Sequence, residues 1–124
     1  MIIINMSIEK KTEVSPEELF NEILLELSKR DKVRFHVNLK NWHRAYYDAK
    51  LKYPESMKGF EGLFREEPYF HEITECFHEF VEAHHLSRII PDGDCLINDP
   101  ERMRFNFPPH EKVQEIARYI CDRI

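Results

Sequence analysis

The chain has few glycines and no long apolar run. Three glycines among 124 residues leave little room for flexible linkers or for the glycine-rich loops that cradle phosphates. No apolar run is longer than about five residues, whereas a transmembrane helix needs roughly 20. We therefore expect no membrane span and a cytoplasmic protein.

Cysteine is also scarce. Cys76, Cys95 and Cys121 are odd in number and widely spaced, which argues against a disulfide framework and a CxxC-type zinc site. Each lies at or beside apolar positions, so we expect three buried thiols that act as small hydrophobic groups. No catalytic or cofactor motif is found, so no cofactor is expected and the sequence favours a protein without enzymatic activity.

Aromatic residues, by contrast, are plentiful. Nine Phe and five Tyr, within 42% hydrophobic residues, supply the large side chains of one core. At this length we expect a single globular domain over residues 1–124. The first twelve residues begin Met1-Ile2-Ile3-Ile4 and are expected to be either frayed or an added edge strand; Met6 is a second candidate start.

Four helices are predicted. Ser15, Pro16 and Glu18 form an S-x-x-E capping box with proline at the first helical position, ahead of apolar residues at helical spacing. The same spacing, in steps of three and four, predicts three more helices. These cover 39–53, 69–86, and the stretch that Pro108 and Pro109 open.

Strands are predicted where apolar residues alternate. Val33, Phe35 and Val37 alternate with polar residues and are expected to face the core. The turn signal at 91–94 predicts a hairpin between 88–90 and 95–97. A final strand is expected from Met103 to Phe107, where apolar and polar residues alternate again.

The fold class that results is α+β and mostly helical. It has four main helices, a short strand and a small antiparallel hairpin, with residues 55–67 as a connector that holds one helical turn at 60–64. This element order is similar to that of a winged helix, although the similarity is one of order alone and implies no function.

Charge is segregated along the sequence. Residues 29–58 contain nine Lys or Arg and three acidic residues, a net charge of +6, and residues 59–82 contain seven Glu and one Arg, a net charge of −6. The overall charge of −5 hides this difference. Two oppositely charged segments suit a protein partner of mixed charge or self-association.

A basic face on helix 39–53 offers an alternative. Basic side chains interleaved with an aromatic ring suit phosphates and unpaired bases, so this face is a candidate nucleic-acid site. Its residues are Lys40, His43, Arg44, Tyr47 and Lys50. The four glutamates of helix 69–86 argue against major-groove reading.

A second alternative is metal binding by helix 69–86. Glu75-x-x-His78 and Glu82-x-x-His85 have the spacing at which one helix offers a carboxylate and an imidazole to a metal ion. One helix supplies only two ligands to one ion, so further ligands would have to come from elsewhere. His84 lies on the apolar stripe and is expected in the core.

The leading interpretation is a small interaction or regulatory domain without chemistry of its own. It binds another macromolecule, with a protein or a second copy of the chain favoured over nucleic acid. Patterned helices, the lack of cofactor motifs and the two charged segments support it.

Overall fold

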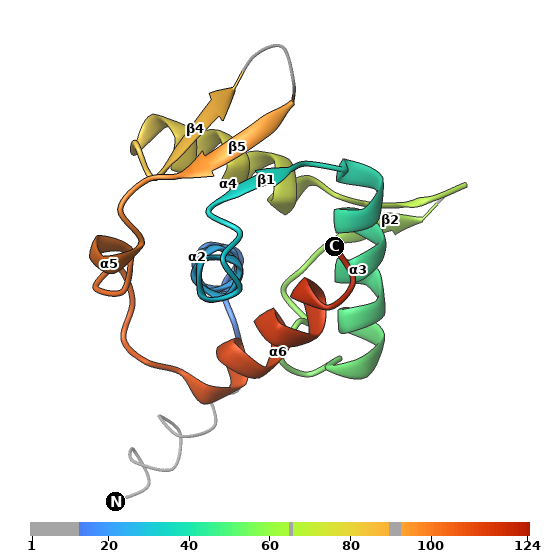
Figure 1. The fold of residues 1–124 in the computed structure, drawn as a ribbon. Helices are drawn as coiled ribbons and strands as arrows, with labels where there is room; N and C mark the ends of the chain where they lie inside the picture. Colours follow the sequence, from blue (N-terminus) through green and yellow to red (C-terminus); the bar gives the residue numbers. More distant parts are fainter. Residues whose placement is uncertain (1–12, 65, 90–92) are drawn as a thin grey trace, which may run out of the picture.

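The computed structural model describes residues 13–64, 66–89 and 93–124. Figure 1 looks along one helix, α2, which lies in the middle of the molecule with the other elements around it. The described helices are α2 (Pro16–Lys29), α3 (Leu39–Lys52), α4 (His71–Glu82), the short α5 (Pro100–Met103) and α6 (Glu111–Cys121). None of them is long and apolar enough to span a membrane. The α+β class with four main helices is confirmed.

Two small antiparallel sheets complete the fold. The first has the order β1–β5–β4 and the second pairs β2 with β3. Their bounds are β1 (Arg34–His36), β2 (Gly62–Phe64), β3 (Pro68–Phe70), β4 (Leu86–Ile89) and β5 (Asp94–Ile97). The strand near 34–36 and the β4–β5 hairpin were predicted, but Val33 is 40% exposed and does not face the core. Residues 91 and 92 of the predicted turn at 91–94 lie outside the described residues, and Gly93 has a left-handed backbone (φ 73°).

Helix α2 begins as its sequence predicts. The Ser15 side chain accepts from the Glu18 N–H at 3.2 Å, and Glu18 Oε1 accepts from the Ser15 N–H at 2.8 Å. The helix ends at Lys29; Asp31, two residues later, has a left-handed backbone (φ 60°), and the Lys32 N–H bonds to Leu27 O at 2.8 Å. At each end of α2, neighbouring residues thus satisfy some of the backbone groups that have no partner within the helix.

The core surrounds α2. The centroid of the Phe20 ring lies 4.8 Å from that of Phe77, 4.8 Å from that of Phe80 and 5.8 Å from that of Trp42. This aromatic cluster joins α2, α3 and α4. Helix α6 packs along the other side of α2. The three cysteines are free and buried in this core, as predicted.

The connector prediction for 55–67 is wrong in its second half. Instead of a helical turn at 60–64, β2 pairs with β3, and α4 begins only at His71. The pairing is supported by contacts outside the hairpin: the Glu61 N–H donates to Glu72 Oε2 of α4 at 2.7 Å, and Pro68 and Phe70 are buried. Local sequence pattern does not contain these contacts.

Helix α4 also ends earlier than predicted. His84 has a left-handed backbone (φ 64°), and the His85 N–H bonds to Phe80 O at 2.9 Å, which closes the helix after Glu82. His84 is exposed, so its predicted place in the core is wrong. Glycine usually occupies this left-handed position after a helix. Because the residue here is histidine, the sequence contains no local signal that the helix ends after Glu82.

The predicted strand from Met103 to Phe107 is wrong as well. Asp99 accepts from the Arg102 N–H at 3.3 Å and begins α5. Buried Asn21 of α2 then binds Met103 O at 3.1 Å and accepts from Asn106 at 2.9 Å, which holds a turn in place. The alternating apolar residues therefore belong to a helix and a turn, and Phe105 is 88% exposed.

Candidate functional site

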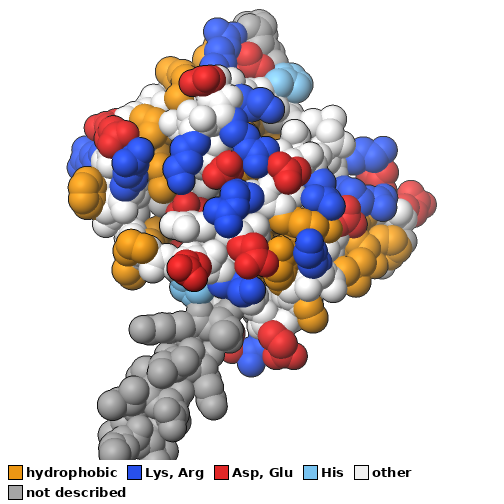
Figure 2. All heavy atoms as spheres, turned by 60° about the horizontal axis from the view of Figure 1, so that its bottom comes forward, with side chains coloured by type: hydrophobic (Ala, Val, Ile, Leu, Met, Phe, Trp, Pro, Cys, Tyr) orange, Lys and Arg blue, Asp and Glu red, His pale blue; other side chains and the backbone are white. Residues whose placement is uncertain are grey.

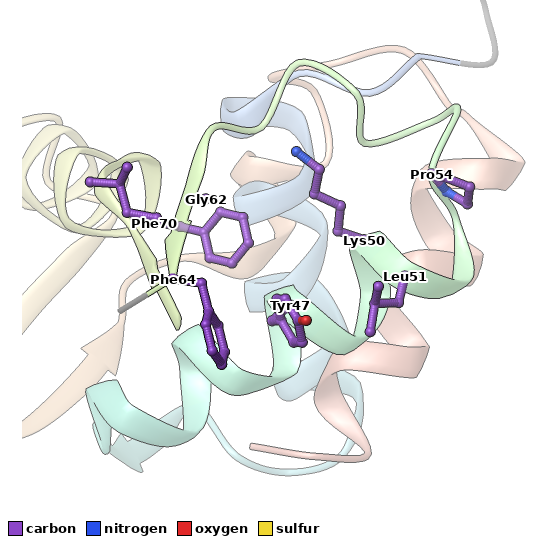
Figure 3. A pocket seen from close by; sticks show the side chains of 8 residues that line it. Tyr47, Lys50, Leu51, Pro54, Gly62, Phe64 and Phe70 are labelled. Atoms are coloured by element: carbon purple, nitrogen blue, oxygen red, sulfur yellow. The ribbon is translucent and has the colours of Figure 1, made fainter. Parts of the chain in front are cut away.

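A groove lies between α3 and the hairpin strand β2. It has a volume of about 310 Å³, and Figure 3 shows its side chains coming from both elements. The residues that line it are Tyr47, Lys50, Leu51, Pro54, Gly62, Leu63, Phe64 and Phe70. We call this feature the α3–β2 groove.

Large apolar side chains stand exposed around the α3–β2 groove. Leu51 is 65% exposed, Leu63 is 64% exposed and Phe64 is 58% exposed. Figure 2 shows one group of hydrophobic side chains on the right of the view, the side on which Figure 1 places α3 and the hairpin, and further groups on the left. Contiguous exposed apolar surface beside a hollow is typical of a binding site.

Helix α3 supplies one wall of the groove through a regular stripe. Tyr47 and Leu51 are four residues apart, so they lie above one another on one side of the helix, and Pro54 follows in the turn after the helix ends at Lys52. The Tyr47 ring lies 5.3 Å from the Phe64 ring at an interplanar angle of 32°. This ring pair joins the two walls at one end of the groove, while Leu51 remains free to contact another molecule.

Strand β2 supplies the other wall, and its outer edge is open. In the ladder, Phe64 pairs with Pro68 and Leu63 pairs with Tyr69. Pro68 has no N–H, so Leu63 and Tyr69 form the hydrogen-bonded pair, because such pairs alternate along antiparallel strands. The N–H and C=O groups of Gly62 and Phe64 consequently point away from β3, and no other described strand pairs with β2.

Because residue 62 is glycine, the Phe70 ring can pack directly against the backbone of β2. A Cβ there would lie 2.7 Å from Cε1 and 2.8 Å from Cζ of Phe70, which is closer than real contacts allow. Figure 3 shows the Phe70 ring beside Gly62. The buried ring therefore lies directly against the strand, and β2 keeps its place beside α3.

His43 holds the hairpin to α3. Its Nδ1 accepts the Phe70 N–H at 3.0 Å, and its ring stacks on Tyr69 at 4.8 Å. Burial lowers the pKa of His43, which favours the neutral ring that this hydrogen bond requires. His43 is 7% exposed, so its predicted place on an exposed basic face is wrong.

The other residues of the predicted nucleic-acid face are only partly available. Lys40 pairs with Glu67 of the hairpin at 2.9 Å, and the Lys50 amine donates to the Phe60 carbonyl. Arg44 is exposed and has no partner among the described residues. The segments of opposite charge are thus neighbours in space, and Figure 2 shows basic and acidic side chains interspersed.

The predicted metal ligands do not converge in the described part of the chain. His78 pairs with Glu82 at 3.0 Å on the exposed side of α4, whereas His85 lies beyond the helix end, 3.3 Å from the Asn106 amide. Among described residues no group of three or more His, Cys, Asp or Glu side chains is placed to hold a metal ion. Metal binding by Glu75, His78, Glu82 and His85 remains an untested prediction.

The thiols are poorly suited to nucleophilic chemistry. Burial raises the pKa of Cys76 and of Cys121 to about 12, and it raises the pKa of Cys95 as well. A thiol with so high a pKa stays protonated near neutral pH, and the thiolate is the reactive form. The α3–β2 groove is consequently a stronger candidate for function than any cysteine.

Sequence reasoning placed Tyr47 and Lys50 at a functional surface but missed Leu51, Leu63 and Phe64. The available signal was two short β-prone stretches, at 62–64 and 68–70, separated by three charged residues. Comparison of the chain with protein-family models, curated proteins and solved structures gave no significant match. The geometry of the groove therefore carries the functional argument alone.

Proposed function

We propose that this chain is a small interaction or regulatory domain, without chemistry of its own, that binds another protein in the α3–β2 groove. The partner contributes an extended segment with alternating apolar side chains. The observation that carries the proposal is the open edge of β2, which borders an apolar groove.

The backbone of β2 supports binding by strand addition. An extended segment in the groove would bond to the outward N–H and C=O groups of Gly62 and Phe64 and so extend the β2–β3 sheet. Main-chain hydrogen bonds of this kind give affinity for many sequences. Selectivity must then come from the side-chain contacts.

The groove walls favour apolar side chains. Every second residue of a bound strand would face Tyr47 and Leu51 of α3. Arg44 lies one turn before Tyr47 on α3 and would pair with a carboxylate of the same segment. A partner segment with apolar residues at alternate positions and one acidic residue fits these walls.

A photo-reactive benzoyl-phenylalanine in place of Phe64 tests the proposal. Irradiation in cells should cross-link a defined protein through an extended segment that mass spectrometry identifies. The matched control carries the same group in place of Phe105, which is 88% exposed and outside the groove, and should not give that product.

The affinity of the identified segment then decides the site. Leu51→Glu should lower its affinity at least tenfold in fluorescence anisotropy, and Phe105→Glu should leave it unchanged. Equal affinities for the native chain and Leu51→Glu would exclude the groove as the site. Tight oligonucleotide binding that weakens steeply with salt would instead favour the nucleic-acid alternative.

A further inference from the structure

We infer that two copies of this chain associate through the open edge of β2, so that the extended segment in each α3–β2 groove is β2 of the other copy. The inference rests on the proposed function, because it names the occupant of the same groove. The two β2 strands run antiparallel about a twofold axis at Leu63, and the two hairpins form one sheet of order β3–β2–β2–β3.

The backbone of β2 is complementary to itself in this register. Gly62 of one copy lies opposite Phe64 of the other, and Leu63 lies opposite Leu63. Within the hairpin, Leu63 and Tyr69 form the hydrogen-bonded pair, which leaves the N–H and C=O groups of Gly62 and Phe64 pointing outward. Each Gly62–Phe64 pair across the axis is therefore a hydrogen-bonded pair, and the outward groups of both strands are satisfied together.

The side chains are complementary as well. Phe64, which is 58% exposed, lies opposite a residue without a side chain. Its ring would enter the second copy's groove between Gly62 and Leu51, which Figure 3 shows on the two walls. An aromatic ring opposite an edge glycine covers the bare backbone of the neighbouring strand. Association thus buries Phe64 of each copy against Leu51 of the other, which is 65% exposed.

The direction of α3 relative to the hairpin places a charge beside the added strand. Lys40 Nζ lies 2.9 Å from Glu67 Oε1, and further along α3 the Tyr47 ring lies 5.3 Å from the Phe64 ring. Helix α3 and the hairpin segment from Phe64 to Glu67 therefore run in opposite directions. Side chains of α3 that lie between Lys40 and Tyr47 face the space beyond Phe64.

Arg44 of one copy and Glu61 of the other reach the same level in that space. Arg44 lies three residues before Tyr47, which is about 4.5 Å along the helix axis. The second copy's Glu61 lies one residue beyond the position opposite Phe64, which is about 3.4 Å in the same direction. Both side chains are exposed, and neither forms an ion pair among the described residues. The twofold axis gives two such pairs of opposite charge.

Charge reversal in the full chain tests the inference by sedimentation equilibrium. Arg44→Glu sets a carboxylate against Glu61 of the other copy, and Glu61→Arg sets two cations together. Each variant alone should raise the Kd of the dimer at least tenfold. An equimolar mixture of the two should regain the native affinity, because both pairs are of opposite charge in the mixed dimer. A contact within one chain could not be restored by mixing.

The matched controls reverse exposed charges elsewhere, with Arg118→Glu on α6 and Glu79→Arg on α4. Both should dimerise like the native chain, alone or mixed. A native chain that stays monomeric at every concentration would overturn the inference, as would charge variants that dimerise as tightly as the native chain. A mixture that dimerises no better than either variant alone would also overturn it.

Leu63→Cys tests the register. At the axis the two residues 63 form a non-hydrogen-bonded pair with Cα atoms about 4.5 Å apart. This separation lies within the range that a disulfide spans, about 4.4–6.8 Å. The native cysteines are buried and should not compete. Mild oxidation should give a covalent dimer of Leu63→Cys on a non-reducing gel. Leu96→Cys, at an exposed position of β5, should stay monomeric on that gel, and equal yields would contradict the register.

Failure of the inference and failure of the proposed function can be told apart. A monomeric native chain that cross-links a different protein from position 64 would overturn the inference and leave the proposed function standing. A monomeric native chain with no cross-linked product would overturn both. When both hold, the product from position 64 joins two copies of the chain through residues of the α3–β2 groove.

Discussion

The two sides of α3 differ in how far their apolar side chains are exposed to solvent. On the inner side, Trp42, Ala45, Tyr46 and Ala49 are 2% exposed or less and pack into the core. On the outer side, Leu51 is 65% exposed and faces the edge of β2. The inner side stabilises the fold, and the outer side is available for binding, so substitutions on the two sides should affect different measurements.

The largest expected effect is on the inner side, at the aromatic cluster. Phe20→Ala removes a fully buried ring that contacts Trp42, Phe77 and Phe80. We expect the free energy of unfolding, measured in urea, to fall by about 3–5 kcal/mol. Phe64→Ala removes a ring that is 58% exposed and should cost no more than about 1.5 kcal/mol. Equal losses would show that the groove is packed like the core.

A smaller loss is expected where the two sides meet. Gly62→Ala places a Cβ 2.7 Å from the buried Phe70 ring, so we expect about 1–3 kcal/mol lower stability from the forced shift. Gly59→Ala is the control, because a Cβ there meets nothing within 4 Å. Similar urea midpoints for the two variants would mean that the Phe70 ring and β2 move apart without a loss of stability.

The cap of α2 should matter less. Ser15→Ala removes the side chain that accepts the Glu18 N–H and should lower the free energy of unfolding by about 1 kcal/mol. Lys40→Ala breaks only the exposed pair with Glu67 and should change stability by less than about 1 kcal/mol. A larger loss for Lys40→Ala than for Ser15→Ala would contradict this ranking.

The weakest expected effect is a pH dependence through His43. Burial lowers its pKa in the folded state, so the unfolded chain binds the proton more readily. Its contribution to stability is complete above the unfolded pKa of about 6.5 and is lost as pH falls through the folded pKa. Urea midpoints should fall from pH 7.5 to pH 5.5, and less steeply in His43→Gln. An equal slope in the variant would show that His43 does not titrate on unfolding.

The candidate site was only partly predictable. Tyr47 and Lys50 stood out as an aromatic and a basic residue on one helix, which is a local pattern. The partners that decide their role, Phe64 and the Phe60 carbonyl, lie on the hairpin and the loop before it. His43 shows the same limit: its spacing indicated an exposed face, and the Phe70 N–H made it part of the hairpin anchor.

The sequence by itself determined α2, because Ser15, Pro16 and Glu18 satisfy the first turn of the helix through contacts three residues apart. It also determined the helical stripes and the buried cysteines, which follow from apolar spacing. Only the tertiary structure decided that 62–64 and 68–70 are strands, that 103–107 is not, and that α3 has an open groove beside it. Those outcomes depend on contacts of Glu72, Phe70 and Asn21 with residues that lie 11, 27 and 82 positions away in the sequence. Patterns that span one or two helical turns carry no information about such contacts.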